Sequence, residues 1–328
     1  MPKPVPAPHR VPAPPAPPAP PVPRLLGALA WASLVANIGI VLTGGVVRLT
    51  GSGLGCPTWP RCTEESFVPQ GELGIHGAIE FGNRLLTFVL VAVAVATFLV
   101  ALRHGRPAIT RIAVVLGLGV PAQAVIGGIT VLTDLNPWTV AFHLLVSMAM
   151  IGVAVLLLRR LHDADGPRQR VVPSGYVALV GAIFATTWGV LYLGTVVTGS
   201  GPHAGDANAP RNGLDPQTWS QLHADLVFLL VGLTLAAVLL LRAVDAPARV
   251  RRPAWALLGV EIAQGAVGFV QYYTGLPEVL VALHLVGAAL TSATATWLLV
   301  AVHAPAPKAV AQKPSSGSSA TVTNSRDR

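Results

Sequence analysis

Charged residues are scarce in this chain of 328 residues: Asp, Glu, Lys and Arg make up 11% of it, whereas 52% of its residues are hydrophobic. This scarcity excludes a soluble protein with a large core, because several apolar runs reach the ~20 residues that cross a bilayer. The runs also lack the alternation of apolar and polar residues that a membrane β-barrel needs, which leaves helices as the spanning elements. The composition therefore predicts an all-α integral membrane protein.

Eight apolar runs predict eight transmembrane helices, arranged as two pseudo-symmetric four-helix bundles. The expected spans are residues 25–47, 80–102, 109–131, 138–160, 175–198, 219–242, 253–273 and 279–302. Residues 24–160 are expected to form the N-terminal half and residues 175–303 the C-terminal half. A linker at 161–174 joins them.

Arginines cluster in three of the predicted loops, which are those after the second, fourth and sixth spans. Because cytoplasmic loops carry the excess of Lys and Arg, these loops and both termini are expected to face the cytoplasm from a cell membrane. The formal net charge of +8 comes largely from these loops. It indicates topology and attraction to a lipid bilayer surface, and not nucleic-acid binding.

The two ends of the chain lack apolar runs. Residues 1–23 are rich in Pro and Ala, and residues 304–328 are rich in Ala, Pro, Lys and Ser. Neither end can bury a core, so both are expected to be disordered tails. The first apolar segment is long enough to span and lacks a typical small-residue cleavage site, which makes a signal peptide the weaker interpretation.

The two halves repeat the same polar landmarks, as membrane proteins with internal repeats do. Gln123 precedes His143 by 20 residues, and Gln264 precedes His284 by the same 20 residues. Four histidines stand at the same ends of four predicted spans: His76, His143, His223 and His284. In this alignment the first histidine of the N-terminal half matches the first of the C-terminal half.

A single histidine at a helix end is usually an ordinary interfacial residue, but four in register indicate paired ligands. Neutral imidazole is a common ligand of haem iron, and ligand sites in four-helix bundles are built from facing helices. The pattern predicts two bis-histidine haem sites, formed by His76 with His143 and by His223 with His284. Zinc is disfavoured because no third or fourth ligand stands near either pair.

One carboxylate distinguishes the halves. Glu80 lies one helical turn beyond His76, and no carboxylate stands at the matching position near Val227. Beside a haem, Glu80 is a candidate proton acceptor or stabiliser of a cation. Alternatively, it is an ordinary partner of Arg84 at i+4.

The only two cysteines, Cys56 and Cys62, lie in the first outward-facing loop, where the predicted topology places them in an oxidising compartment. A disulfide closing this short loop is expected. Its purpose is open between a structural staple and a redox or substrate-guarding role.

Residues 45–57, GVVRLTGSGLGCP, together with Trp59, Pro60 and Cys62, resemble the signature of the haem A synthase family. The resemblance covers residues 25–302. It implies an enzyme, an oxidoreductase that converts haem O to haem A by oxidising a ring methyl to a formyl group in successive hydroxylations. It also implies delivery of haem A to cytochrome c oxidase.

The resemblance further implies a role for each candidate residue. His223 and His284 would bind haem b, His143 would bind the substrate haem, Glu80 would be the catalytic carboxylate, and Cys56 and Cys62 would form the outer-loop pair. Arg48 and Arg84 are candidate contacts for haem propionates, with interfacial snorkelling as the alternative. Haem O synthase and assembly factors of cytochrome c oxidase are possible partners, and an electron acceptor is required.

The chain departs from the family at Asn83, where many members have a histidine three residues after the glutamate. His76 is expected to take over as ligand of the substrate iron. The alternative is an iron held by His143 alone. Two other functions stay open on the residues: a bis-histidine di-haem electron-transfer protein, which would not need Glu80, and a transporter with repeats, which would bind no haem.

Overall fold

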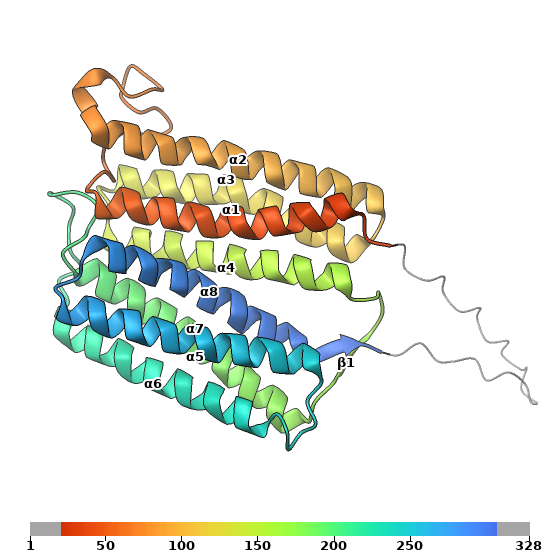
Figure 1. Ribbon diagram of the computed structural model, residues 1–328. Coiled ribbons are helices and arrows are strands. Elements are labelled where there is room, and N and C mark those ends of the chain that lie inside the picture. The colour runs from red at the N-terminus through yellow and green to blue at the C-terminus, as the bar shows by residue number, and fades with distance from the viewer. Residues whose placement is uncertain (1–20, 307–328) are drawn as a thin grey trace, which may run out of the picture.

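The computed structural model describes residues 21–306, and its framework is eight long helices lying side by side (Figure 1). All eight are long and apolar enough to cross a membrane. They are α1 (Arg24–Leu49), α2 (Gly74–His104), α3 (Pro107–Leu132), α4 (Pro137–His162), α5 (Ser174–Ser200), α6 (Pro216–Leu240), α7 (Ala248–Tyr273) and α8 (Glu278–Ala301). The predicted fold class and number of spans are confirmed. The expected tails lie mostly outside the described residues.

The helix boundaries follow from local chemistry. Pro107, Pro137 and Pro216 occupy the first turns of α3, α4 and α6, where a missing N–H costs nothing. Asn136 caps α4 by accepting from the Trp138 N–H, and Asp215 caps α6 by accepting from the Thr218 N–H. These caps fix where α4 and α6 begin. His143 follows its cap residue by seven positions, and His223 follows its cap residue by eight.

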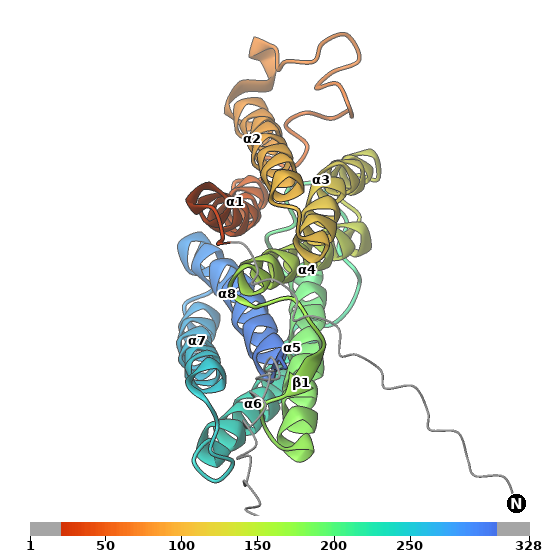
Figure 2. The ribbon, with the colours of Figure 1, turned by 90° about the vertical axis from the view of Figure 1, so that its right-hand side faces the viewer.

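Each half is a ring of four helices. In the N-terminal half α1 packs on α2, α2 on α3, α3 on α4 and α4 back on α1, and the C-terminal half repeats this order from α5 to α8. The view along the bundle shows the two rings stacked with α4 and α8 between them (Figure 2). In both rings the histidine-bearing helices, α2 with α4 and α6 with α8, therefore occupy opposite corners.

The halves meet mainly along α4 and α8, which run parallel. The Ser292 hydroxyl of α8 donates to the Met148 carbonyl of α4 at 2.9 Å. One turn further along both helices, a Cβ added to Gly152 would lie 3.0 Å from the Thr296 hydroxyl. This parallel packing puts His143 and His284 at the same end of the molecule, which we call the disulfide end. The opposite end is called the arginine end.

Two differences from the expected organisation concern segments that are too short or too polar for a hydropathy signal. Helix α2 begins at Gly74, after a 3-10 turn η1 (Gly71–Leu73), and not near residue 80, so His76 lies in its first turn. At the arginine end, β1 (Arg168–Arg170) pairs antiparallel with β2 (His303–Pro305). The second strand thus extends into the segment from residue 304 that was expected to be a disordered tail.

Candidate functional site

The disulfide end of the N-terminal half is covered by the loop between α1 and η1. Cys56 and Cys62 form a disulfide in this loop, with Cα atoms 4.4 Å apart, and both are fully buried. Trp59, between them, lies against α3, because a Cβ added to Gly128 would overlap its indole ring. The loop is therefore seated on both α2 and α3 and closes the end of the ring.

Glu80 and Arg84 fasten this loop to α2. The Arg84 Nη2 lies 2.5 Å from the Glu80 Oε1, and Nε lies 3.1 Å from the same oxygen. The other Glu80 oxygen accepts from the backbone N–H of Cys56. Glu80 is only 5% exposed. Its carboxylate thus has a partner on each oxygen and is fixed in orientation at the boundary between the loop and the helix.

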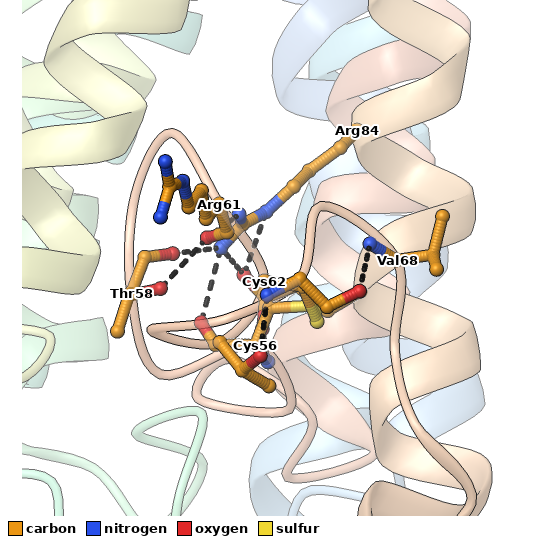
Figure 3. Close-up of a disulfide and its surroundings, with 9 residues drawn as sticks. Cys56, Thr58, Arg61, Cys62, Val68 and Arg84 are labelled. Atoms are coloured by element: carbon orange, nitrogen blue, oxygen red, sulfur yellow. Dashed lines mark hydrogen bonds and ion pairs between the residues drawn. A yellow bond between two sulfur atoms is a disulfide. The ribbon is translucent and has the colours of Figure 1, made fainter.

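Arg84 also binds the loop directly. Its guanidinium donates to the carbonyls of Cys56 and Thr58 at 3.0 Å and of Arg61 at 3.1 Å. Figure 3 shows the guanidinium inside the turn of the loop with these carbonyls around it. A planar group with five donors suits this arrangement, whereas a lysine could not make it. The predicted i, i+4 pair of Glu80 and Arg84 is therefore present, and it anchors the disulfide loop.

His143 enters the same ring from α4. Its Nδ1 is buried without a hydrogen-bond partner in the described part of the chain. Its ring lies beside α3, where a Cβ added to Gly127 would be 3.3 Å from Cε1. Gln123 of α3 donates to the His143 carbonyl at 3.3 Å and to the Ser147 hydroxyl at 2.6 Å. The imidazole of His143 therefore packs on Gly127 of α3, and Trp59 of the loop packs on the adjacent Gly128.

The C-terminal half repeats this geometry with both of its histidines. A Cβ added to Gly194 of α5 would lie 3.3 Å from the His223 Cε1, and one added to Gly268 of α7 would lie 3.4 Å from the His284 Cε1. In both rings the histidine Nδ1 is buried in protein. Gln264 donates to the His284 carbonyl at 2.8 Å, as Gln123 does to His143.

These features fit a haem. Two imidazoles on opposite corners of a four-helix ring can face each other across its interior. The glycines beside them give each imidazole room to pack on the neighbouring helix. The Nδ1 of each of these rings is buried in protein, which leaves Nε2 as the nitrogen that could bind iron. His223 and His284 could thus hold a haem in the C-terminal half, and His143 could bind one in the N-terminal half.

His76 is placed differently from its expected counterpart His223. Its side chain is exposed in the first turn of α2, and its Nδ1 lies 2.9 Å from the hydroxyl of the buried Ser52. Gly44 of α1 corresponds to Gly194 of α5 when Val46 and Val47 are matched with Val196 and Val197. Nothing lies within 4 Å of a Cβ built at Gly44. The structure therefore does not bring the His76 ring to the helix position at which the His223 ring lies.

Asn83 makes the contact between α2 and α1 that is equivalent to the contact of His223 between α6 and α5. Its Oδ1 accepts from the Thr43 hydroxyl at 2.8 Å, and Thr43 directly precedes Gly44. In the other half, His223 packs on Gly194. By this contact the structural counterpart of His223 is Asn83, seven residues beyond His76.

Arg48 joins the two halves at the disulfide end. Its Nε donates to the carbonyl of His203 at 2.6 Å, and its Nη2 donates to the carbonyl of Thr198 at 2.9 Å. Nearby, the Gly53 N–H donates to the Gly205 carbonyl at 2.7 Å. Both arginines expected near propionates are thus held by protein groups. Arg48 is held by the end of α5 and the loop after it, and Arg84 is held by Glu80 and the disulfide loop.

Sequence reasoning missed several residues of this site. Trp59 belongs to the sequence motif after the first span, but its contact with Gly128 has no signal in the local sequence. The glycines beside the histidines could have been found, because Gly127 and Gly268 each lie 16 residues before a histidine. Glu261 could also have been found, as the single carboxylate inside the seventh apolar span.

Comparison with known proteins gives one family for this arrangement. The COX15-CtaA family model, described as cytochrome oxidase assembly protein, matches residues 27–211. A heme A synthase of Geobacillus kaustophilus is 32% identical over 131 residues, which are 39% of this chain and 40% of that protein. A heme A synthase of Geobacillus thermodenitrificans is 34% identical over 122 residues, 36% of this chain and 37% of that protein.

A longer alignment exists with a heme A synthase of Caulobacter sp. strain K31, which is 28% identical over 330 residues, covering 84% of this chain and 96% of that protein. The Geobacillus alignments, by contrast, each span well under half the length of the relative. The likeness is thus strongest in part of the chain and weaker over its whole length.

Proposed function

The chain belongs to the COX15-CtaA family of cytochrome oxidase assembly proteins, and from this premise we propose that it is a haem A synthase. The proposed reaction oxidises one methyl group of haem O to a formyl group and yields haem A for cytochrome c oxidase. The names of its relatives support this activity. The observation that carries the proposal is the assembly of Glu80, Arg84 and the disulfide loop in one half of the repeat only.

The proposed cofactor is haem b in the C-terminal half, with His223 and His284 as its axial ligands. Bound there, it would supply one-electron transfer. The supporting observations are the matching glycines beside the two rings and the buried Nδ1 of each. With Nδ1 turned toward protein, Nε2 is left as the nitrogen for iron.

The proposed substrate site lies in the N-terminal half, with His143 as one ligand of the haem O iron. His76 is the second ligand proposed from the sequence, and the Ser52 hydroxyl on its Nδ1 would orient the ring. The contact of Asn83 with Thr43 supports the other arrangement, in which an amide faces the iron and His143 is its only protein ligand. Arg48 and Arg84 are proposed to lie near the propionates.

Glu80 is proposed as the catalytic carboxylate. Oxidising a methyl carbon to the formyl level breaks C–H bonds, and each proton released inside a membrane needs an acceptor. Glu80 is buried at the boundary of the ring, and its orientation is fixed by the Cys56 N–H and the Arg84 guanidinium. Both donors favour the ionised carboxylate and oppose the cost of burying its charge.

The disulfide loop is proposed to exclude water from this carboxylate. Cys56 and Cys62 are fully buried, and Trp59 rests on Gly128 beside the glycine under His143. Excluding water strengthens every electrostatic contact to Glu80 and protects the oxidised carbon from side reactions. The disulfide restricts the loop that provides three carbonyls and one N–H to this site.

The proposed location is a cell membrane, with the arginine end and both termini in the cytoplasm. The arginine clusters in the loops after α2, α4 and α6 support this orientation. Haem O is the proposed substrate, and haem O synthase and assembly factors of cytochrome c oxidase are proposed partners. An electron acceptor must take up the electrons removed from the methyl carbon.

The test is expression of the full chain in a host that makes haem O but not haem A, followed by mass analysis of the extracted haems. Appearance of haem A supports the proposal. Unchanged haem O, from membranes in which the protein is folded and loaded with haem, would instead indicate a di-haem electron-transfer protein.

A further inference from the structure

A second buried carboxyl group lies in the middle of the C-terminal half. Glu261, on α7, is 3% exposed. The Thr234 hydroxyl of α6 donates to its Oε1 at 2.9 Å, and its Oε2 is buried with no partner in the described residues. An ionisable group at such a depth in a membrane segment is expensive and is usually retained for function. Neither the substrate site nor the axial ligands account for it.

Glu261 shares a helix face with the glycine beside His284. Gly268, which packs on the His284 ring, follows Glu261 by seven residues. Seven residues make almost two helical turns, so the two positions lie on one face of α7 and about 10 Å apart along its axis. Gln264, between them, binds the His284 carbonyl. Glu261 therefore faces the interior of the ring, on the arginine-end side of the histidines.

The N-terminal half has apolar residues at the positions that correspond to Glu261 and Thr234. Gln123 and Gln264 correspond, and the same register puts Val120 opposite Glu261 in the repeat. The register that matches Asn83 to His223 puts Ala94 opposite Thr234. Ala94 and Val120 are both buried and line the same small cavity. Their counterparts, Thr234 and Glu261, are likewise neighbours and share a hydrogen bond. Since Ala94 and Val120 fill these positions in one half, packing alone does not account for the carboxyl group in the other.

No fixed cation balances Glu261 within residues 21–306, where none of the ion pairs includes it. Helix α7 packs on α6 and α8. The ionisable side chains on these three helices, besides Glu261, are His223 and Asp225 on α6, Glu278 and His284 on α8, and Arg249, Arg251, Arg252, Tyr272 and Tyr273 on α7. Apart from the two histidines and Asp225, all of them lie near helix ends. Asp225 is exposed and accepts a hydrogen bond from the Gln221 amide at 2.7 Å. The nearest site whose charge can change is thus the one between His223 and His284.

We propose that Glu261 is the proton acceptor coupled to reduction of the haem held by His223 and His284. Glu261 takes up one proton when the ferric iron gains one electron, and it releases that proton when the electron leaves. The electron comes from oxidation of the substrate methyl carbon. Proton uptake keeps the net charge of the ring unchanged, which avoids an uncompensated negative charge in a medium of low dielectric constant. This inference rests on the proposed haem b site.

The experiment is a redox titration of the purified, haem-loaded full chain at several pH values around neutrality. Because the reduced form holds one more proton, the midpoint potential should fall as pH rises, with a slope approaching ~59 mV per pH unit for one electron. In Glu261→Gln the slope should disappear. Glu278→Gln, which removes a carboxyl group at the end of α8, is the matched control and should keep the wild-type slope.

Infrared difference spectra of the reduced and oxidised wild-type protein give a second measurement that does not depend on a variant folding. A carboxyl band should appear on reduction and should be missing in Glu261→Gln. A pH-independent potential in the wild type, or an equal slope in Glu261→Gln, would overturn the inference while leaving the haem site intact. Absence of a two-histidine haem signal from the C-terminal half would overturn the haem b proposal and this inference together.

Discussion

The guanidinium of Arg84 lies 2.5 Å from the carboxylate of Glu80, one turn earlier on α2, and donates at the same time to carbonyls of the disulfide loop. The cation thus joins the proposed catalytic group to the segment that covers it. Both oxygens of Glu80 are engaged, one by Arg84 and the other by the Cys56 N–H. Displacing any part of this assembly should displace the carboxylate.

Arg84→Lys should lower haem A formation on the order of 100-fold, because a lysine keeps the charge but cannot bind the carboxylate and the loop carbonyls together. Product formation is measured beside the haem b absorption spectrum, which should not change. Arg61→Lys is the control, since the Arg61 side chain lies over the Phe67 ring and not on Glu80. Equal losses in the two variants would contradict a specific role for Arg84.

Replacing both Cys56 and Cys62 by Ser should destabilise the closed loop by about 2 kcal/mol, the loop-closure term for so short a segment. We expect haem A formation to fall because the loop supplies the Cys56 N–H to Glu80. Protease sensitivity of residues 51–70 should rise, and the C-terminal half should keep its haem. Full activity of the double variant would show that the loop is held adequately without the disulfide.

His223→Ala and His284→Ala should each abolish the low-spin, two-histidine spectrum of haem b. Within residues 21–306 no third metal-ligating side chain is grouped with this pair to replace the lost ligand. His162→Ala, at the exposed arginine end of α4, is the control and should leave the spectrum unchanged. The measurement is paramagnetic resonance of the purified protein. A two-histidine signal that survives both substitutions would place the haem elsewhere.

Asn83→His should give the substrate haem a second imidazole, because Asn83 lies at the position that His223 has in the other half. The low-spin signal of the substrate haem should increase, and it should persist when His76 is also replaced by Ala. If Asn83→His changes nothing while His76→Ala alone removes a low-spin signal, His76 is the ligand. The wild-type protein loaded with haem O is the reference.

The helices were predictable because apolar runs of bilayer length are strong signals, and the Glu80–Arg84 pair was predictable from its i, i+4 spacing. The start of α2 was predicted six residues late, because Gly74, His76 and Gly77 carry little hydropathy. The strand pairing of residues 168–170 with 303–305 was missed, since three-residue strands have no usable period. The seating of Trp59 on Gly128 depends on tertiary packing and leaves no local trace.

The repeat alignment shows the same limit in the candidate site. Matching His223 to His76 compares their order along the sequence. Matching the contacts between α1 and α2 with those between α5 and α6 instead identifies Asn83 as the counterpart of His223. A shift of seven residues keeps nearly the same helical face, so the face alone could not distinguish the two positions. Depth along the helix, which only the neighbouring helix defines, distinguishes them.

The most direct test of the central claim is mass analysis of haems from membranes of a haem-O-producing host that expresses the wild-type chain, Glu80→Gln or Glu72→Gln. Glu72 is an exposed carboxylate in the turn before α2 and serves as the matched control. We predict haem A from the wild type and from Glu72→Gln, and only haem O or a hydroxylated intermediate from Glu80→Gln. Haem A from Glu80→Gln at the wild-type level would contradict the assignment of Glu80 as the catalytic carboxylate, and absence of haem A from all three haem-loaded proteins would contradict the proposed enzyme.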